Sequence, residues 1–304
     1  RDWSSDVCSS DLLENALDGA DPVLTPASTV VDEPTVFYYE DRAYSPGNSG
    51  REYYGEVMLR DALVHSLNVA TVQVAQAVGY RRVVDFCRRL RLESNLRPTP
   101  SIALGAYEVT PLDMAAAYTA FANRGARCEP VSLLRMVSRE GGTVQETELQ
   151  RKYVLDPRVA YLVTSILEDV VNRGTGAGVR SRGFYAPAAG KTGTSRDGWF
   201  AGYTTNLLCI VWVGFDDHRE LGLAGASSAA PIWAEFMKQA IKLPAFSGTQ
   251  AFERPEGVVS VAIDPETRQL AAPGCPEVRE EVFIAGTEPT ETCALHGESF
   301  IERI

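Results

Sequence analysis

The spacing of apolar residues predicts a mainly helical first half of the chain. From residue 56 onward, Leu59, Leu63 and Leu67 recur every four residues, which is the repeat of one face of a helix. Further helical patterns cover residues 69–78, 82–92, 110–123, 156–172 and 230–241. Two of these helices open with a capping residue followed by proline, Thr110-Pro111 and Asp156-Pro157, which is typical of a helix start.

Three short strand-like segments follow the helices between residues 174 and 230. One leads into Lys191, and the others cover residues 199–204 and 207–215. The links between them are of hairpin length, so the strands should pair antiparallel. Helices before and after the strands predict an α+β fold, within the broad α/β class, in which an antiparallel sheet is covered by helices.

The remaining pattern is less regular. Residues 18–48 contain four prolines and are expected to form loops, whereas residues 132–146 should form a hairpin around Gly141-Gly142. Beyond Pro244 the chain is expected to form a small β-rich extension, in which residues 258–263 pair with residues 269–272.

The first twelve residues, RDWSSDVCSSDL, have neither helical nor strand periodicity, and the pattern changes abruptly at Leu13. The string looks like a translated sequencing adapter and is expected to be foreign to the fold. The sequence therefore predicts a main domain over residues 13–245 and an extension over residues 246–304.

Composition narrows the functional classes. The 304 residues are 45% hydrophobic, which is ordinary for a globular protein, and the net charge of −11 disfavours a nucleic-acid partner. No apolar run approaches the ~20 residues that a membrane-spanning helix needs, and no signal peptide is evident. The chain as given is expected to be soluble, which is compatible with a fragment of an anchored protein.

Two of the six cysteines, Cys275 and Cys293, lie in the Pro/Gly-rich extension, which has few core residues of its own. A disulfide between them would brace this part and would indicate an oxidising compartment. The alternative is a metal site that adds His296 in a Cys-x-x-His spacing, but it lacks a fourth ligand in the sequence. The disulfide is the favoured prediction.

The segment around Lys191 carries the clearest candidate chemistry. Gly190-Lys191-Thr192 matches the end of a phosphate-binding loop, but that motif needs glycine where the chain has Tyr185, and a helix where a strand pattern follows. A strand edge that receives an acyl substrate fits better. Lys191 would supply a positive charge for a substrate carboxylate, and Gly193 would let a substrate backbone lie close to the strand.

The two threonines of this segment extend the predicted site. The hydroxyl groups of Thr192 and Thr194 would also bind the carboxylate, and the amide of Thr194 would face a developing oxyanion. A second candidate element, Ser66-Leu67-Asn68, falls where two predicted helices meet, so Ser66 and Asn68 could face the same cleft. A simple helix cap is the alternative interpretation of that pair.

In this order, Ser-x-Asn and Lys-Thr-Gly are two of the three motifs shared by penicillin-binding proteins and active-serine β-lactamases. From Leu13 to about Gly297 the chain resembles the transpeptidase part of bifunctional (class A) penicillin-binding proteins. The resemblance rests on DEP at residues 32–34, YSPGNSGREYYGEVMLRDALVHSLN at 44–68, ALGAYEVTPLDMAAAYTAFANRG at 103–125, GKTGTSRDGWFAGYT at 190–204, and the tail from Cys275 to His296.

The resemblance implies a serine β-lactamase/D,D-peptidase-like fold and an enzyme that cross-links cell-wall peptides. A serine attacks the D-Ala-D-Ala bond of a peptidoglycan stem peptide, and the acyl group passes to an amine of a neighbouring peptide. Ser66 would shuttle protons with the general-base lysine of the family's Ser-x-x-Lys motif, Asn68 would hold the donor amide, and the amide of Thr194 would provide half of the oxyanion hole. β-Lactams would acylate the same serine. Neither a cofactor nor a metal is implied.

The family also implies parts that these residues do not contain. They are an N-terminal membrane anchor and a glycosyltransferase domain. The protein would contact a membrane only through this anchor. The expected location is the periplasmic face of the bacterial inner membrane.

The nucleophile of the family belongs to a Ser-x-x-Lys motif, which would fall on residues 1–12. None of the four serines there is followed by lysine three residues later. The lysines of the chain, Lys152, Lys191, Lys238 and Lys242, are not preceded by serine at that spacing either. The chain as given is therefore expected to be inactive.

Two other classes of protein fit the sequence less well. A secreted β-lactamase would often carry a Glu-x-x-Leu-Asn loop, which the sequence lacks. A non-catalytic module that senses cell-wall fragments would be expected to have lost the second and third motifs as well, whereas Ser66, Asn68, Lys191 and Gly193 are present.

Overall fold

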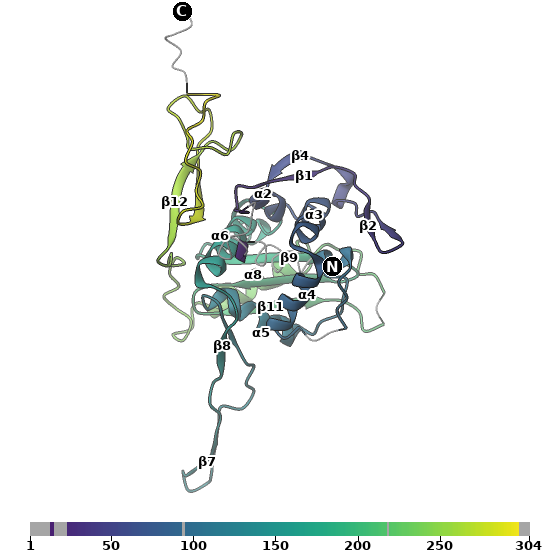
Figure 1. Cartoon of the computed structure of the whole chain (residues 1–304). Helices are drawn as coiled ribbons and strands as arrows, with labels where there is room; N and C mark the ends of the chain where they lie inside the picture. Colours follow the sequence, from purple (N-terminus) through teal and green to yellow (C-terminus); the bar gives the residue numbers. More distant parts are fainter. Residues whose placement is uncertain (1–12, 15–22, 93–94, 218, 298–304) are drawn as a thin grey trace, which may run out of the picture.

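A three-stranded antiparallel sheet forms the centre of the computed structural model, which describes residues 13–14, 23–92, 95–217 and 219–297 (Figure 1). Its strands are β9 (Ala189–Thr194), β10 (Gly198–Tyr203) and β11 (Leu208–Val213), in the order β11-β10-β9. Both pairings are antiparallel and run through the full six residues of β10. The predicted antiparallel sheet is confirmed.

Helices pack on both faces of this sheet because its side chains alternate. Tyr203 of β10 belongs to the larger hydrophobic core together with residues of α6, whereas Phe200 packs against Trp233 of α8 in a second core. A hydrogen bond of 2.9 Å between Thr164 Oγ1 and the Tyr203 hydroxyl ties α6 to the sheet. The helices are α2 (Leu59–Val64), α3 (Asn68–Val78), α4 (Tyr80–Arg89), α5 (Pro111–Ala122), α6 (Pro157–Arg173), α7 (Gly178–Ser181) and α8 (Ala229–Ala240), with short 3-10 turns η1 (Ser49–Arg51) and η2 (Pro100–Leu104).

The capped helix starts lie where the sequence placed them. Thr110 Oγ1 accepts a hydrogen bond from the amide of Asp113 at 3.1 Å, and Asp156 Oδ1 accepts one from the amide of Arg158 at 2.8 Å. Each side chain satisfies an amide that the first turn of a helix leaves without a partner. Within the part of the chain that the structure describes, no helix combines the length and apolarity needed to cross a bilayer.

The first helix and the segment before it differ from the prediction. Residues 55–58 form a strand, β4 (Gly55–Met58), paired with β1 (Thr29–Asp32), so the helix begins at Leu59 and not at residue 56. Two more short strands, β2 (Phe37–Tyr39) and β3 (Arg42–Tyr44), form a hairpin in the region expected to be loops. Strands of three or four residues at the edge of a domain tolerate nearby prolines. The prolines of this segment therefore indicated loops although short strands are present.

The predicted hairpin within residues 132–146 is present and projects away from the body of the molecule (Figure 1). It consists of β6 (Arg135–Val137) and β7 (Thr143–Glu146), and Gly141 has a positive φ of 86° in the turn. At its base, β5 (Ala126–Cys128) pairs with β8 (Arg151–Tyr153).

The C-terminal extension forms an elongated lobe along one side of the domain (Figure 1). Its strands β12 (Val258–Ile263) and β13 (Arg279–Ile284) pair antiparallel. This differs from the predicted pairing of residues 258–263 with residues 269–272, of which only an isolated bridge between Ile263 and Leu270 forms. β13 offers a partner of full length, and Leu270 also bridges Thr292, so the segment after the turn links β12 to the tail.

Cys275 and Cys293 are free cysteines in the structure, which differs from the predicted disulfide. Each thiol has a polar contact instead. Cys293 Sγ lies 3.2 Å from Asp264 Oδ2, and the amide of Ala272 donates to Cys275 Sγ at 3.2 Å. The two sulfur atoms therefore belong to a larger polar cluster.

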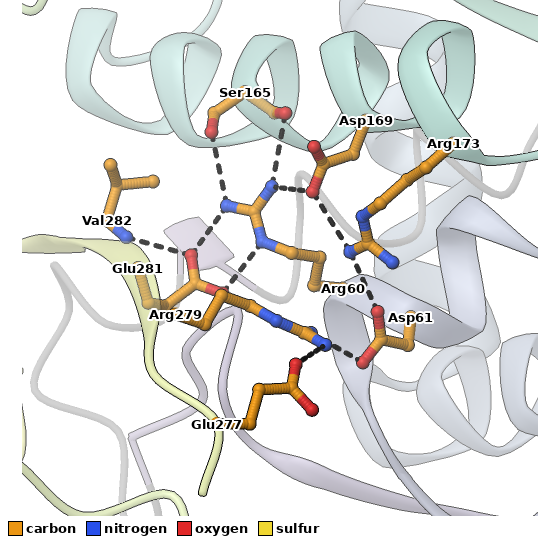
Figure 2. A network of polar contacts seen from close by, with 9 residues as sticks. All are labelled: Arg60, Asp61, Ser165, Asp169, Arg173, Glu277, Arg279, Glu281 and Val282. Carbon is orange, nitrogen blue, oxygen red and sulfur yellow. Dashed lines mark hydrogen bonds and ion pairs between the residues drawn. The ribbon is translucent and has the colours of Figure 1, made fainter. Parts of the chain in front are cut away.

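A buried ion network ties the extension to the main domain (Figure 2). Arg60 of α2 is 3% exposed, and its Nε donates to Glu281 of β13 at 2.7 Å. The same guanidinium group contacts Asp169 of α6 at 3.1 Å. Beside it, burial alone would raise the pKa of Asp61, but hydrogen bonds from Arg279 and Arg173 hold the pKa below its usual value.

Glu168 of α6 makes the stability of the domain pH-dependent. Burial, followed by the neighbouring Asp169 carboxylate, raises the pKa of Glu168 to about 7. The native carboxyl group then holds a proton that the unfolded chain has lost, so stability falls as the pH rises from about 4.5 to 7. We expect Glu168→Gln to be as stable as the parent at pH 4 and more stable by about 1–3 kcal/mol at pH 8.

Urea unfolding at several pH values measures this difference. Glu256→Gln, which changes an exposed glutamate, is the matched control and should leave the pH profile unchanged. An unchanged profile for Glu168→Gln as well would contradict the assignment.

Candidate active site

Ser66 lies at a sharp break between two helices. α2 ends at Val64 and α3 begins at Asn68, and the amide of Ser66 donates to Leu63 O at 3.1 Å. Ser66 has a φ of 53°, in the left-handed region that residues with a side chain rarely adopt. Such a conformation costs on the order of 1–3 kcal/mol and is concentrated at functional sites. The break directs the Ser66 hydroxyl toward the sheet.

Lys191 of β9 meets that hydroxyl. Its side chain is 2% exposed, and its Nζ donates a hydrogen bond to Ser66 Oγ across 125 residues of sequence. A second hydrogen bond of 2.9 Å goes to the carbonyl oxygen of Thr192. The structure therefore brings together the two segments that the sequence singled out separately.

Asn68 follows two residues after Ser66 at the start of α3. Its Nδ2 donates to the carbonyl oxygen of Gly47 at 2.7 Å, so the side chain holds the loop around residues 45–50. Asn68 thus makes its hydrogen bond to this loop and not to Lys191. The loop becomes part of the site's border.

A buried pair, Asp32 and Asn48, fixes that loop from behind. Asn48 Nδ2 donates to Asp32 Oδ1 at 2.8 Å and Oδ2 at 2.9 Å, and Asn48 Oδ1 accepts from the amide of Val69 at 3.4 Å. Asp32 is 0% exposed. Sequence reasoning gave neither residue a role. The signal was an aspartate and an asparagine within two proline-containing motifs, too far apart in sequence to be paired.

β9 is an edge strand of the described sheet, where its partner is β10. Gly193 lies opposite Trp199, and a Cβ atom at Gly193 would lie 3.1 Å from Trp199 Cβ. A Cβ atom at Gly225 would lie only 2.2 Å from the carbonyl oxygen of Gly193. Gly193 is therefore closely packed against Trp199, and it is Gly225 whose lack of a side chain lets the loop approach the carbonyl oxygen of Gly193.

The hydroxyl groups of the two threonines lie in different surroundings. Thr192 is buried, and its Oγ1 lies 2.7 Å from Thr175 Oγ1, whereas Thr194 is exposed and accepts from the amide of Gly225 at 3.0 Å. The amide of Thr175 also donates to the carbonyl oxygen of Val64 at 3.2 Å, at the end of α2. Thr175, which sequence reasoning missed, thus connects the Ser66 side of the site to β9.

A large hollow of about 1110 Å³ lies beside the carboxyl end of β9. Its lining includes Ser195, Arg196, Trp199 and Trp212. Ser66 and Lys191 do not line it, so the hollow adjoins the site without containing it. It provides room for a molecule that reaches the end of the strand.

The helix-covered sheet and the Ser66–Lys191 contact are those expected of a penicillin-binding transpeptidase domain, and comparisons with known proteins show this family. The family model described as "Penicillin binding protein transpeptidase domain" matches residues 20–238, and the one described as "Penicillin-binding protein 1A, C-terminal domain" matches residues 254–298. The chain belongs to the penicillin-binding protein transpeptidase family.

Individual relatives carry the same names. Penicillin-binding protein 1A of Pseudomonas aeruginosa is 31% identical over 91% of this chain and 40% of its own length, and that of Aquifex aeolicus is 34% identical over 89% and 37%. The chain therefore spans about two fifths of these relatives. The crystal structure of penicillin-binding protein 1A from Haemophilus influenzae superposes with a TM-score of 0.86 at 27% identity, covering 95% of this chain and 48% of the other.

Proposed function

We propose that this chain is the D,D-transpeptidase domain of a class A penicillin-binding protein, which cross-links peptidoglycan stem peptides on the periplasmic side of the inner membrane. The hydrogen bond from Lys191 Nζ to Ser66 Oγ beside an edge strand carries the proposal. It places a buried cation and a hydroxyl group together where an extended peptide can lie along β9.

The donor peptide would bind along β9 through its backbone. The charge of Lys191 would attract the terminal carboxylate, and the exposed Thr194 would contribute its hydroxyl group to the same carboxylate. The Thr194 amide would donate to the oxyanion that forms during attack. One such donor accounts for roughly 10²–10³ in rate.

Ser66 would relay protons. Because Lys191 donates to Ser66 Oγ, the Ser66 oxygen acts as the acceptor in this contact, and its own hydrogen would be available for donation to a reacting group. In acylation, the nucleophilic serine oxygen bonds to the carbonyl carbon, the bond to D-alanine breaks, and the serine proton passes through Ser66 to the leaving amine. The acceptor amine then attacks the ester, and its proton returns by the same route to the serine oxygen.

The nucleophile of this scheme belongs to a Ser-x-x-Lys motif, and the 304 residues contain none. We infer that the chain as given binds donor peptides without being acylated by them or by β-lactams.

Binding without acylation is testable on the chain itself. A peptide that ends in D-Ala-D-Ala, titrated into the ¹⁵N-labelled protein, should shift the amide resonances of Gly193 and Thr194 and the side-chain amide of Asn68. Lys191→Met should weaken binding at least about tenfold, because a hydrogen bond to a charged group contributes about 1.5–3 kcal/mol. Lys152→Met, which changes an exposed lysine of β8, is the matched control.

Two outcomes would refute the proposal. The peptide could shift resonances elsewhere and leave those of β9 unchanged, or a folded Lys191→Met variant could bind as tightly as the parent.

A further inference from the structure

Four side chains of the C-terminal extension converge outside the site built around Ser66 and Lys191. Asp264 follows β12, Cys275 lies in the loop before β13, and Cys293 and His296 come from the tail. One ligand atom from each of the four residues lies within 4.8 Å of all the others. The sequence offered three of these groups, and the fold supplies the fourth.

We propose that Asp264, Cys275, Cys293 and His296 bind one Zn²⁺ ion as a structural site. Zinc takes thiolate, imidazole and carboxylate ligands, and structural sites are four-coordinate and tetrahedral. Bonds of about 2.0–2.3 Å give a tetrahedron whose edges are roughly 3.3–3.8 Å long. Three of the separations in the cluster are 2.6, 3.2 and 3.5 Å, and all of them lie within 4.8 Å, so shifts of about an ångström would give this tetrahedron. Four protein ligands leave no open position, so the ion would brace the lobe and would not activate water.

Asp264 is oriented for ligation by its own turn. Its Oδ1 accepts hydrogen bonds from the amides of Glu266 at 2.8 Å and Thr267 at 3.3 Å. Its Oδ2 is thereby directed at Cys293 Sγ, 3.2 Å away, and at His296 Nδ1, 2.6 Å away. Zinc would replace the proton between the carboxylate and the imidazole, and these two atoms would separate by less than an ångström.

The histidine also has the environment of a zinc ligand. Its Nδ1 faces the cluster, and its Nε2 lies 3.7 Å from Glu266 Oε2. A carboxylate beside the outer ring nitrogen is the usual arrangement for a metal-bound histidine, because it fixes the tautomer and raises the basicity of the ligating nitrogen.

Burial and packing favour a cation in this place. Asp264 and Cys293 are each 1% exposed, so a carboxylate and a thiolate here need a positive partner. The backbone wraps the cluster closely. A Cβ atom at Gly274 would lie 2.1 Å from the carbonyl oxygen of His296, and one at Gly297 would lie 2.6 Å from that of Cys293. The two glycines let the ligand-bearing segments approach one another.

The competing arrangement is a Cys275–Cys293 disulfide beside an Asp264–His296 ion pair. A disulfide uses two of the four groups and is independent of Asp264. A zinc site uses all four and keeps both thiols reduced. Metal content and thiol count therefore separate the two arrangements.

The test uses the whole chain, purified without chelators. Elemental analysis should find one zinc per chain, and all six cysteines should react with a thiol reagent after denaturation in the presence of a chelator. Substitution with Co²⁺ should produce thiolate-to-metal charge-transfer bands. A zinc-free chain with four reactive thiols, or one that takes up neither Zn²⁺ nor Co²⁺, would overturn the proposal.

Asp264→Asn separates the two arrangements again. The substitution removes the negative charge of the ligand and nearly preserves the shape of the side chain. It should lower zinc affinity at least tenfold, measured in competition with a chromophoric chelator. A Cys275–Cys293 disulfide would still form in this variant. Cys209→Ser, which changes a free cysteine of β11, is the matched control and should retain one zinc. The metal content and the Co²⁺ spectrum of the unmodified chain decide the matter even if Asp264→Asn fails to fold.

Discussion

No covalent adduct is expected when the 304-residue chain is incubated with a fluorescent penicillin and analysed on a denaturing gel. Lys191 of β9 is in contact with Ser66, but no Ser-x-x-Lys motif occurs in the chain. Loss of the nucleophile lowers the rate by a factor on the order of 10⁶ in a well-studied serine hydrolase. At such a rate the amount of labelled protein would be too small to detect on a gel. A labelled band that disappears after prior incubation with unlabelled penicillin would contradict this prediction.

A graft supplies the positive control. Residues 1–12 are replaced by a segment that carries the Ser-x-x-Lys motif of penicillin-binding proteins, and labelling should appear. In that background Ser66→Ala should slow acylation by about 10²–10⁴, the range of general acid–base catalysis. His65→Ala, which changes the exposed neighbour of Ser66, should label as fast as the graft. Equal rates for Ser66→Ala and the graft would remove Ser66 from the proton relay.

Local signals in the sequence predicted the local parts of the fold. The cap-proline pairs at Thr110 and Asp156 placed two helix starts correctly, because a cap acts on amides within its own first turn. The links around residues 195–197 and 204–207 predicted the antiparallel sheet, because strands joined by such short links can pair only with their neighbours in the opposite direction. The contact between Ser66 and Lys191 could be predicted because the two motifs occur in the order found in penicillin-binding proteins. The chemistry of a serine and a lysine alone would not have predicted it.

Contacts between distant segments were the ones that the sequence could not provide. Asp32 and Asn48 support the site from a buried position, and no periodicity links them to Ser66. Asp264 lies in the turn that links residues 258–263 to residues 269–272, which sequence analysis expected only to join two strands, so the predicted cluster of Cys275, Cys293 and His296 lacked its fourth member. In each case a polar residue acquires its role from a partner that only folding brings close.

The second large effect is expected at the ion network that joins α2 to the extension. Arg60 is 3% exposed and Glu281 is 0% exposed, and both charges depend on each other for neutralisation (Figure 2). Removing one partner of a buried pair typically costs 3–5 kcal/mol, because the remaining charge stays desolvated. Arg60→Met should therefore destabilise the protein by about that amount in urea unfolding.

The structure also predicts the order of the single variants. After Glu281→Gln, Arg60 keeps Asp169 at 3.1 Å, whereas after Arg60→Met the Glu281 carboxylate keeps only the amide of Val282 among the donors drawn in Figure 2. Arg60→Met should thus cost more than Glu281→Gln, and Arg60→Met/Glu281→Leu should recover much of the loss, because apolar residues of similar volume often replace a buried pair without penalty.

Arg88→Met is the control for this comparison, because the Arg88 and Asp85 side chains form an ion pair on the surface and are 65% and 61% exposed. This variant should lose less than about 1 kcal/mol of stability. If Arg60→Met proves no more harmful than Arg88→Met, the network does not hold the extension to the domain. If the double variant instead loses as much as both single variants combined, the two charges act independently, and their contact is incidental to the stability of the lobe.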